Sequence, residues 1–226
     1  MPDLLRARAT AAPPRVLADL GAGEGAMLYA LERAGLVGER IYAVDLSADL
    51  VALTERLSPK VVGVASDVAR IDALEDSSVD AVTCSQVIEH LPDDRALAIE
   101  IARILRPGGW FYVASVIRGR WAWWFRRGHG RWGLDPTHLH EYASEDAFTE
   151  ALRHPGLELE RVQSRPLRFA LADPAVRLAS AARLLSAERL STVYERHRLL
   201  ALARAAVKVR VPGYRLVEAV GRRAPE

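Results

Sequence analysis

The chain has 226 residues, half of them hydrophobic, which suits one domain with a full core over 1–226. Its formal net charge is only +2, although the last third is rich in arginine and poor in acids. No apolar run is long enough to cross a bilayer, and the first residues lack the apolar stretch of a signal peptide. A single cysteine excludes an internal disulfide framework. We therefore expect a cytoplasmic protein.

The first half of the chain alternates between two patterns. Short apolar runs typical of buried strands are separated by amphipathic stretches typical of helices. The expected strands are 15–20, 41–46, 61–65, 79–84 and 110–117. The expected helices are 24–34, 48–57 and 93–105. This alternation predicts βαβ units and therefore an α/β fold with a doubly wound, mostly parallel sheet.

The second half is less regular. A connection at 118–142 is rich in Trp, Arg, Gly and His and is unusually long for a plain loop. Ser144 is expected to cap a short helix. Strands are expected at 157–169 and 214–220, and Pro212-Gly213 predicts a turn just before the second of these strands. Between these strands, 174–207 has one apolar side, which predicts helices that pack on the core or form a homodimer contact.

A glycine loop, Asp19-Leu20-Gly21-Ala22-Gly23-Glu24-Gly25, joins the first expected strand to a helix. Its glycines let the backbone approach a ligand, and the helix adds its N-terminal dipole. The loop also fits the dinucleotide fingerprint, so an NAD-dependent oxidoreductase is an alternative. Asp19 separates the two interpretations, because a carboxylate would repel pyrophosphate but would hold a cationic amino-acid group.

Two further acids follow neighbouring strands. Asp45 ends the second strand, where an acid accepts hydrogen bonds from ribose hydroxyls. Asp67 follows the third strand and could accept from an adenine amino group. Together with Asp19 they would line one crevice outside the carboxyl ends of the strands, where open α/β sheets bind ligands.

These motifs, with Glu89-His90-Leu91-Pro92 and Leu105-Arg106-Pro107-Gly108-Gly109, resemble the class I S-adenosylmethionine (SAM) dependent methyltransferases. The resemblance implies a Rossmann-like sheet of seven strands with the last strand antiparallel, and SAM as the cofactor. It makes 174–207 a helical insertion and 118–142 the acceptor-side connection. The residues that it assigns to cofactor binding are Asp19, Gly21, Ala22, Gly23, Gly25, Asp45, Leu46, Asp67, Val68 and Ser85.

For the reaction, SAM brings an activated methyl group, and the protein mainly aligns an in-line displacement. An acceptor hydroxyl or amine can also need a general base. The candidates are His90, His138, His140 and Tyr142. Some relatives that act on quinone precursors or RNA 3′ ends bind a divalent cation at this place. In this chain Gln86 replaces their first acid, so we expect no metal.

We expect a small-molecule acceptor, with O-methylation preferred over N- or C-methylation. The alternatives are a nucleic-acid acceptor, which the basic last third favours, and a lipid or quinone-type acceptor. The Asn/Asp-Pro-Pro-aromatic loop of nucleic-acid amino methyltransferases is absent, and so is the Tyr-x-x-x-Lys pair of many dehydrogenases. The tryptophans of Trp121–Trp132 favour a pocket lid or peripheral contact with a membrane.

Overall fold

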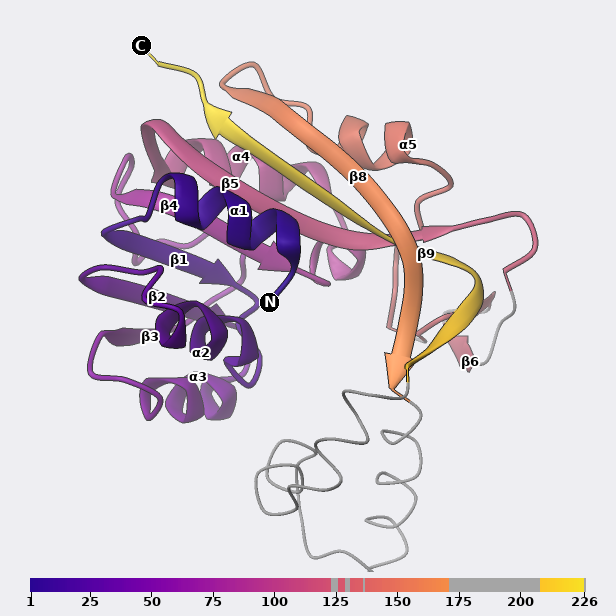
Figure 1. The fold of residues 1–226 in the computed structure, drawn as a ribbon, viewed down its shortest axis with the longest axis horizontal. Helices are drawn as coiled ribbons and strands as arrows, with labels where there is room; N and C mark the ends of the chain where they lie inside the picture. Colours follow the sequence, from indigo (N-terminus) through magenta and orange to yellow (C-terminus); the bar gives the residue numbers. More distant parts are fainter. Residues whose placement is uncertain (123–125, 129–130, 136, 171–207, 226) are drawn as a thin grey trace, which may run out of the picture.

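The structure is a computed structural model that describes residues 1–122, 126–128, 131–135, 137–170 and 208–225. In this part of the chain a seven-stranded sheet has the strand order β3-β2-β1-β4-β5-β9-β8, with helices on both faces (Figure 1). The doubly wound α/β fold expected from the alternating pattern is thereby confirmed. The predicted helices at 174–207 lie outside the described residues.

One half of the sheet is parallel and built from short units. Its strands are β1 (Val16–Leu20), β2 (Arg40–Asp45), β3 (Val61–Ala65) and β4 (Val79–Ser85). The connecting helices are α2 (Ala26–Arg33) and α3 (Ala48–Glu55), and an unpredicted helix α1 (Asp3–Ala11) precedes them. The carboxyl ends of β1, β2, β3 and β4 therefore share one edge, as the sequence predicted.

The other half of the sheet has long strands. β5 (Leu105–Arg118) pairs parallel to β4, and β9 (Lys208–Arg223) runs antiparallel between β5 and β8 (Leu157–Ala170). The antiparallel last strand is confirmed. Its predicted start was too late, because Pro212-Gly213 forms an irregularity within the strand and not a turn before it. Gly213 has a φ of +77°, and β9 then continues down to Lys208.

Alternate residues of each central strand enter two separate cores. Leu17 packs with α1 and α2, whereas Ala18 and Leu20 pack with α4 (Arg95–Ile104) and α5 (Glu145–Ala151). Both faces of the sheet are therefore buried, which explains the nearly continuous apolar runs of the strands. The predicted cap of α5 is confirmed, because Ser144 Oγ accepts a hydrogen bond from Ala147 N at 3.1 Å.

The connection after β5 returns to the edge of the sheet. It includes the two-stranded ladder of β6 (Arg126–Gly128) and β7 (Arg131–Gly133). At its end Arg118 N donates to Tyr142 O at 2.8 Å, which holds the connection against β5. The backbone amides of Leu139 and His140 donate to Glu89 O, so this part of the connection lies close to the short helix η1 (Ile88–His90), which follows β4.

Candidate active site

The glycine loop folds back on β2 and leaves space on its outer side. Gly21 N and Ala22 N both donate to Val44 O, at 2.8 and 2.9 Å. Gly21 has a φ of +72°, and a Cβ there would lie 2.2 Å from Val87 Cγ2. A Cβ at Gly23 would meet no atom within 4 Å. Gly21 is therefore required by packing, whereas Gly23 borders open space beside the loop.

Asp45 fixes the loop to the end of β2. One carboxylate oxygen accepts from Gly23 N at 2.9 Å, and the other accepts from Ser47 N at 3.0 Å. Beside it, Leu46 has 76% of its surface exposed, which is unusual for a leucine at a strand end. A planar ligand on the glycine loop would cover this apolar side chain.

Asp19 is buried at the end of β1, with 3% of its surface exposed. Thr83 Oγ1 on β4 donates to Asp19 Oδ1 at 2.5 Å. Burial raises the pKa of Asp19 to about 7; the Thr83 hydrogen bond lowers it and the charge of Asp45 adds to the increase. A cation placed beside this carboxylate would favour its ionised form.

The remaining predicted cofactor residues lie along the same edge of the sheet. Asp67 is exposed after β3, and its Oδ1 accepts from Ala69 N at 2.9 Å. The side chain of Val68 is buried in the core, so only its backbone can meet a ligand. Ser85 is half-buried at the end of β4, and Gly25 is the N-cap residue that precedes α2. The structure thus brings all ten predicted positions to the carboxyl ends of β1, β2, β3 and β4.

Glu89 lies in η1, just beyond the carboxyl end of β4. Gln86 has a φ of +60°, which turns the chain from β4 into η1. The Glu89 side chain is fully buried, and its Oε2 accepts from Ser115 Oγ on β5 at 2.8 Å. Its Oε1 has no hydrogen-bond partner among the described residues. Burial raises the pKa of Glu89, and its bonds to backbone and to Ser115 oppose the rise.

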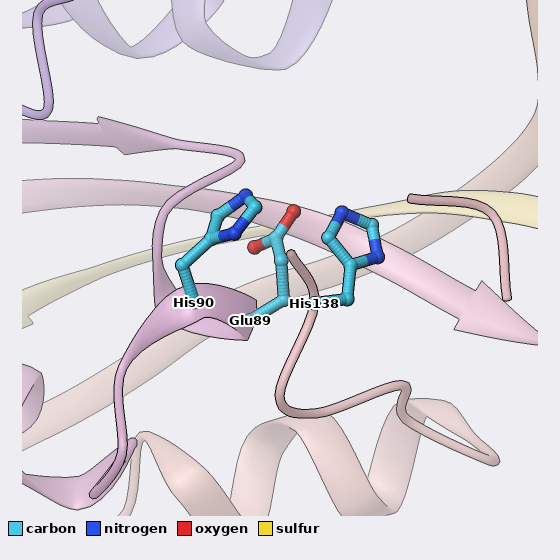
Figure 2. A group of neighbouring side chains, drawn as sticks. All are labelled: Glu89, His90 and His138. Carbon is cyan, nitrogen blue, oxygen red and sulfur yellow. The ribbon is translucent and has the colours of Figure 1, made fainter. Parts of the chain in front are cut away.

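Two histidines stand next to this carboxylate (Figure 2). His90 Nδ1 lies 3.2 Å from the carbonyl oxygen of Thr137, which can only accept, so Nδ1 carries the proton. The rings of His90 and His138 meet edge to face at 4.8 Å. One ligand atom from each of Glu89, His90 and His138 lies within 4.8 Å of the others, a group that could hold a metal ion. Burial and the neighbouring His90 lower the pKa of His138.

The other two candidate bases occupy different surroundings. The backbone amides of Leu139 and His140 donate to Glu89 O at 2.8 and 3.0 Å, which ties this segment to η1. Nε2 of His140 is buried and has no partner within the described ranges. Tyr142 packs on Phe148 in the core and donates to Asp94 Oδ2 at 3.0 Å. Burial raises the pKa of Tyr142 well above its usual value, so this hydroxyl stays protonated.

Sequence reasoning did not include Ser115 among the site residues. A single serine within an apolar strand is usually a satisfied core residue, and only the structure shows its contact with Glu89. Glu89 entered the sequence analysis only as part of the motif Glu89-His90-Leu91-Pro92. Its burial beside two histidines is what makes it a candidate site residue.

The chain is similar to several known proteins. A model described as a methyltransferase domain matches residues 18–113. A ubiquinone biosynthesis O-methyltransferase of Xylella fastidiosa is 32% identical over 171 residues, which are 71% of this chain and 67% of that protein. One of Xanthomonas oryzae pv. oryzae is 34% identical over 125 residues, so the chain matches about half of its length, 48%. The crystal structure of the 4+2 cyclase SpnF is similar in fold, with a TM-score of 0.65, 21% identity, and coverage of 99% of this chain and 80% of that one.

Proposed function

Because the chain belongs to the class I SAM-dependent methyltransferase family, we propose that it methylates a hydroxyl group of a small aromatic acceptor. The observation that carries this proposal is the group formed by the buried Glu89 with His90 and His138, in and beside η1, which follows β4. SAM supplies the methyl group, and the protein must align the acceptor oxygen with the methyl carbon and the sulfur. In this proposal the acceptor oxygen would lie beside these three side chains.

His90 is the proposed general base. A phenolic hydroxyl has an ordinary pKa of about 10, so its oxygen attacks more readily when a base takes the proton. The bond from Nδ1 to the carbonyl of Thr137 fixes the tautomer of His90. Its Nε2 is then the basic nitrogen, which can accept the proton of the acceptor.

Glu89 and His138 support this role in two ways. A charged His90 imidazolium favours the ionised form of Glu89, so the buried carboxylate would in turn stabilise the protonated base. The lowered pKa of His138 keeps its ring neutral at pH 7, so His138 does not repel that charge. The Glu89 carboxylate therefore has two imidazole rings beside it, a neutral one from His138 and a basic one from His90.

The acceptor class follows from the relatives. They are named for ubiquinone biosynthesis, and ubiquinone carries methoxy groups on a quinone ring. We propose a dihydroxybenzene-type quinone precursor as the acceptor. Labelled SAM is to be incubated with the chain and with catechols, primary amines and RNA, and methylated products identified by mass spectrometry. Methyl ethers of the catechols are expected, and methylation of amines or RNA alone would contradict the proposal. The same incubation with the His90→Gln variant, which lacks the proposed base, should yield less of the methyl ether.

A bound divalent cation is the second candidate for activating the acceptor. The expectation of no metal came from Gln86, but Glu89, His90 and His138 together give a carboxylate and two imidazoles, a donor set that suits Zn²⁺. A metal held there would lower the pKa of a bound hydroxyl. Calorimetry of chelator-treated protein with Zn²⁺ and Mg²⁺ distinguishes the candidates: micromolar binding that Glu89→Gln abolishes supports a metal, whereas no binding and full turnover in chelator support His90 alone.

We also propose peripheral contact with an anionic membrane. Trp121 has 86% of its surface exposed, and no helix among the described residues is long and apolar enough to cross a bilayer. The far end of β8 and β9 carries exposed basic residues, and Arg168 stands directly opposite Arg210, which is unfavourable without an anion nearby. Sedimentation with phosphatidylglycerol vesicles tests this contact. Binding should weaken in Trp121→Ala and in Arg168→Gln, and equal binding to phosphatidylcholine vesicles would argue against it.

A further inference from the structure

Thr83 and Asp19 form an isolated polar pair inside the sheet. They are register partners on β4 and β1, and the Thr83 side chain is fully buried. Among the described residues, Thr83 makes the only side-chain hydrogen bond to this carboxylate, at 2.5 Å. A buried hydroxyl destabilises a core unless it is bonded. The Thr83 hydroxyl is therefore satisfied in the core by its hydrogen bond to Asp19.

The surroundings of Asp19 oppose its negative charge. The titratable groups that interact with it are Asp45 at the end of β2 and Cys84 on β4, and neither supplies a positive charge. Burial raises the pKa of Asp19 to about 7, and the hydroxyl of Thr83 is the contact that lowers it. At neutral pH the carboxylate is thus close to half-protonated in the chain without ligand.

We propose that Thr83 is a positioning residue for SAM, because its hydroxyl orients the Asp19 carboxylate and favours the ionised form that attracts the ammonium group of SAM. This proposal rests on the assignment of Asp19 to the amino-acid end of SAM. Binding of the ammonium then requires loss of the Asp19 proton. Affinity should rise about tenfold per pH unit below pH 7 and level off above it. Without the hydroxyl, the same rise should occur at higher pH.

The test compares two ligands and two variants by calorimetry between pH 6 and 8.5. S-adenosylhomocysteine carries the amino-acid end, whereas 5′-methylthioadenosine lacks it. For Thr83→Val we expect the curve of S-adenosylhomocysteine affinity against pH to shift to higher pH by about one unit. The affinity should then fall about tenfold at pH 6.5 and change little at pH 8.5. Thr83→Ser should restore the original curve, and 5′-methylthioadenosine should bind with the same affinity throughout.

Two results would overturn the proposal. One is a pH-independent affinity of the unmodified chain for S-adenosylhomocysteine. The other is an equal loss of both ligands at every pH in Thr83→Val, which would show a structural role; the thermal melting curve of each variant, measured beside the titrations, shows whether it folds. Neither result depends on the acceptor, so failure here is distinct from failure to methylate a hydroxyl group.

Discussion

Two groups of residues at the carboxyl ends of the strands differ in how their polar atoms are bonded. One is the proposed cofactor edge, around the glycine loop and Asp45, and the other is the proposed acceptor edge, around Glu89, His138 and His140. On the cofactor edge the chain bonds its own acids, as when Asp45 accepts two backbone amides. On the acceptor edge three buried atoms lack hydrogen-bond partners in the described part of the chain: Glu89 Oε1, His138 Nδ1 and His140 Nε2. Each such atom costs about 1–3 kcal/mol of stability. Asp45 is therefore held in place by the chain itself, whereas the polar atoms around Glu89 are open to bonds from a ligand.

Replacement of the proposed base should separate the two edges most strongly. His90→Gln is expected to lower kcat about 100- to 1000-fold, because the acceptor hydroxyl keeps its proton. The dissociation constant for S-adenosylhomocysteine should change less than twofold. Steady-state kinetics and calorimetry measure both quantities, and His154→Gln, in the loop after α5, is the control. A tenfold loss of S-adenosylhomocysteine affinity would show that the edges are not independent.

Two glycine variants test the cofactor edge itself. Gly21→Ala places a methyl group against Val87 and should destabilise the chain by about 2–3 kcal/mol, whereas Gly23→Ala meets no atom and should cost about 1 kcal/mol for its backbone alone. Both should weaken SAM binding about tenfold or more. Chemical denaturation and calorimetry provide the readouts. If Gly23→Ala bound SAM normally, the space beside the loop would not be the cofactor site.

Stability as a function of pH tests the burial of Asp19. With its pKa raised to about 7, the folded chain binds this proton more tightly than the unfolded chain. The free energy of unfolding therefore decreases as pH rises from about 4 to 7, and Asp19→Asn removes that loss. The variant without ligand should melt about 10 °C higher than the unmodified chain at pH 8, with little gain at pH 4.5. An equal shift at both pH values would contradict the raised pKa.

The smallest expected effect concerns Tyr142. Tyr142→Phe removes the hydrogen bond to Asp94 and should lower the free energy of unfolding by about 1 kcal/mol. Turnover should stay within twofold, because this hydroxyl lies in the core and stays protonated. Denaturation and initial-rate measurements are sufficient. A hundredfold loss of kcat with unchanged stability would return Tyr142 to the candidate bases.

The sequence predicted the positions of the glycine loop and of Asp45 in the fold because the signals for them are local. A glycine loop between a strand and a helix, and an acid at the end of β2, follow from neighbouring residues in the chain. The acceptor edge depends on contacts between distant segments, such as Ser115 with Glu89 and Thr137 with His90. The hydrophobic periodicity of the sequence does not predict contacts between residues so far apart in the chain. The extent of β9 was missed for another reason, since Pro212-Gly213 ends most strands but here sits at an irregularity within one.

The attachment of Leu139 and His140 to η1 has a consequence for how selectivity can change under the proposed function. Glu89 uses its backbone carbonyl to hold the amides of these two residues, so the contact does not depend on which side chains those positions carry. If the segment borders the acceptor, as proposed, substitutions there would alter the shape and polarity of the acceptor site without releasing the segment from η1. Mutagenesis libraries at these two positions offer a direct way to change the accepted substrate while the cofactor edge is preserved.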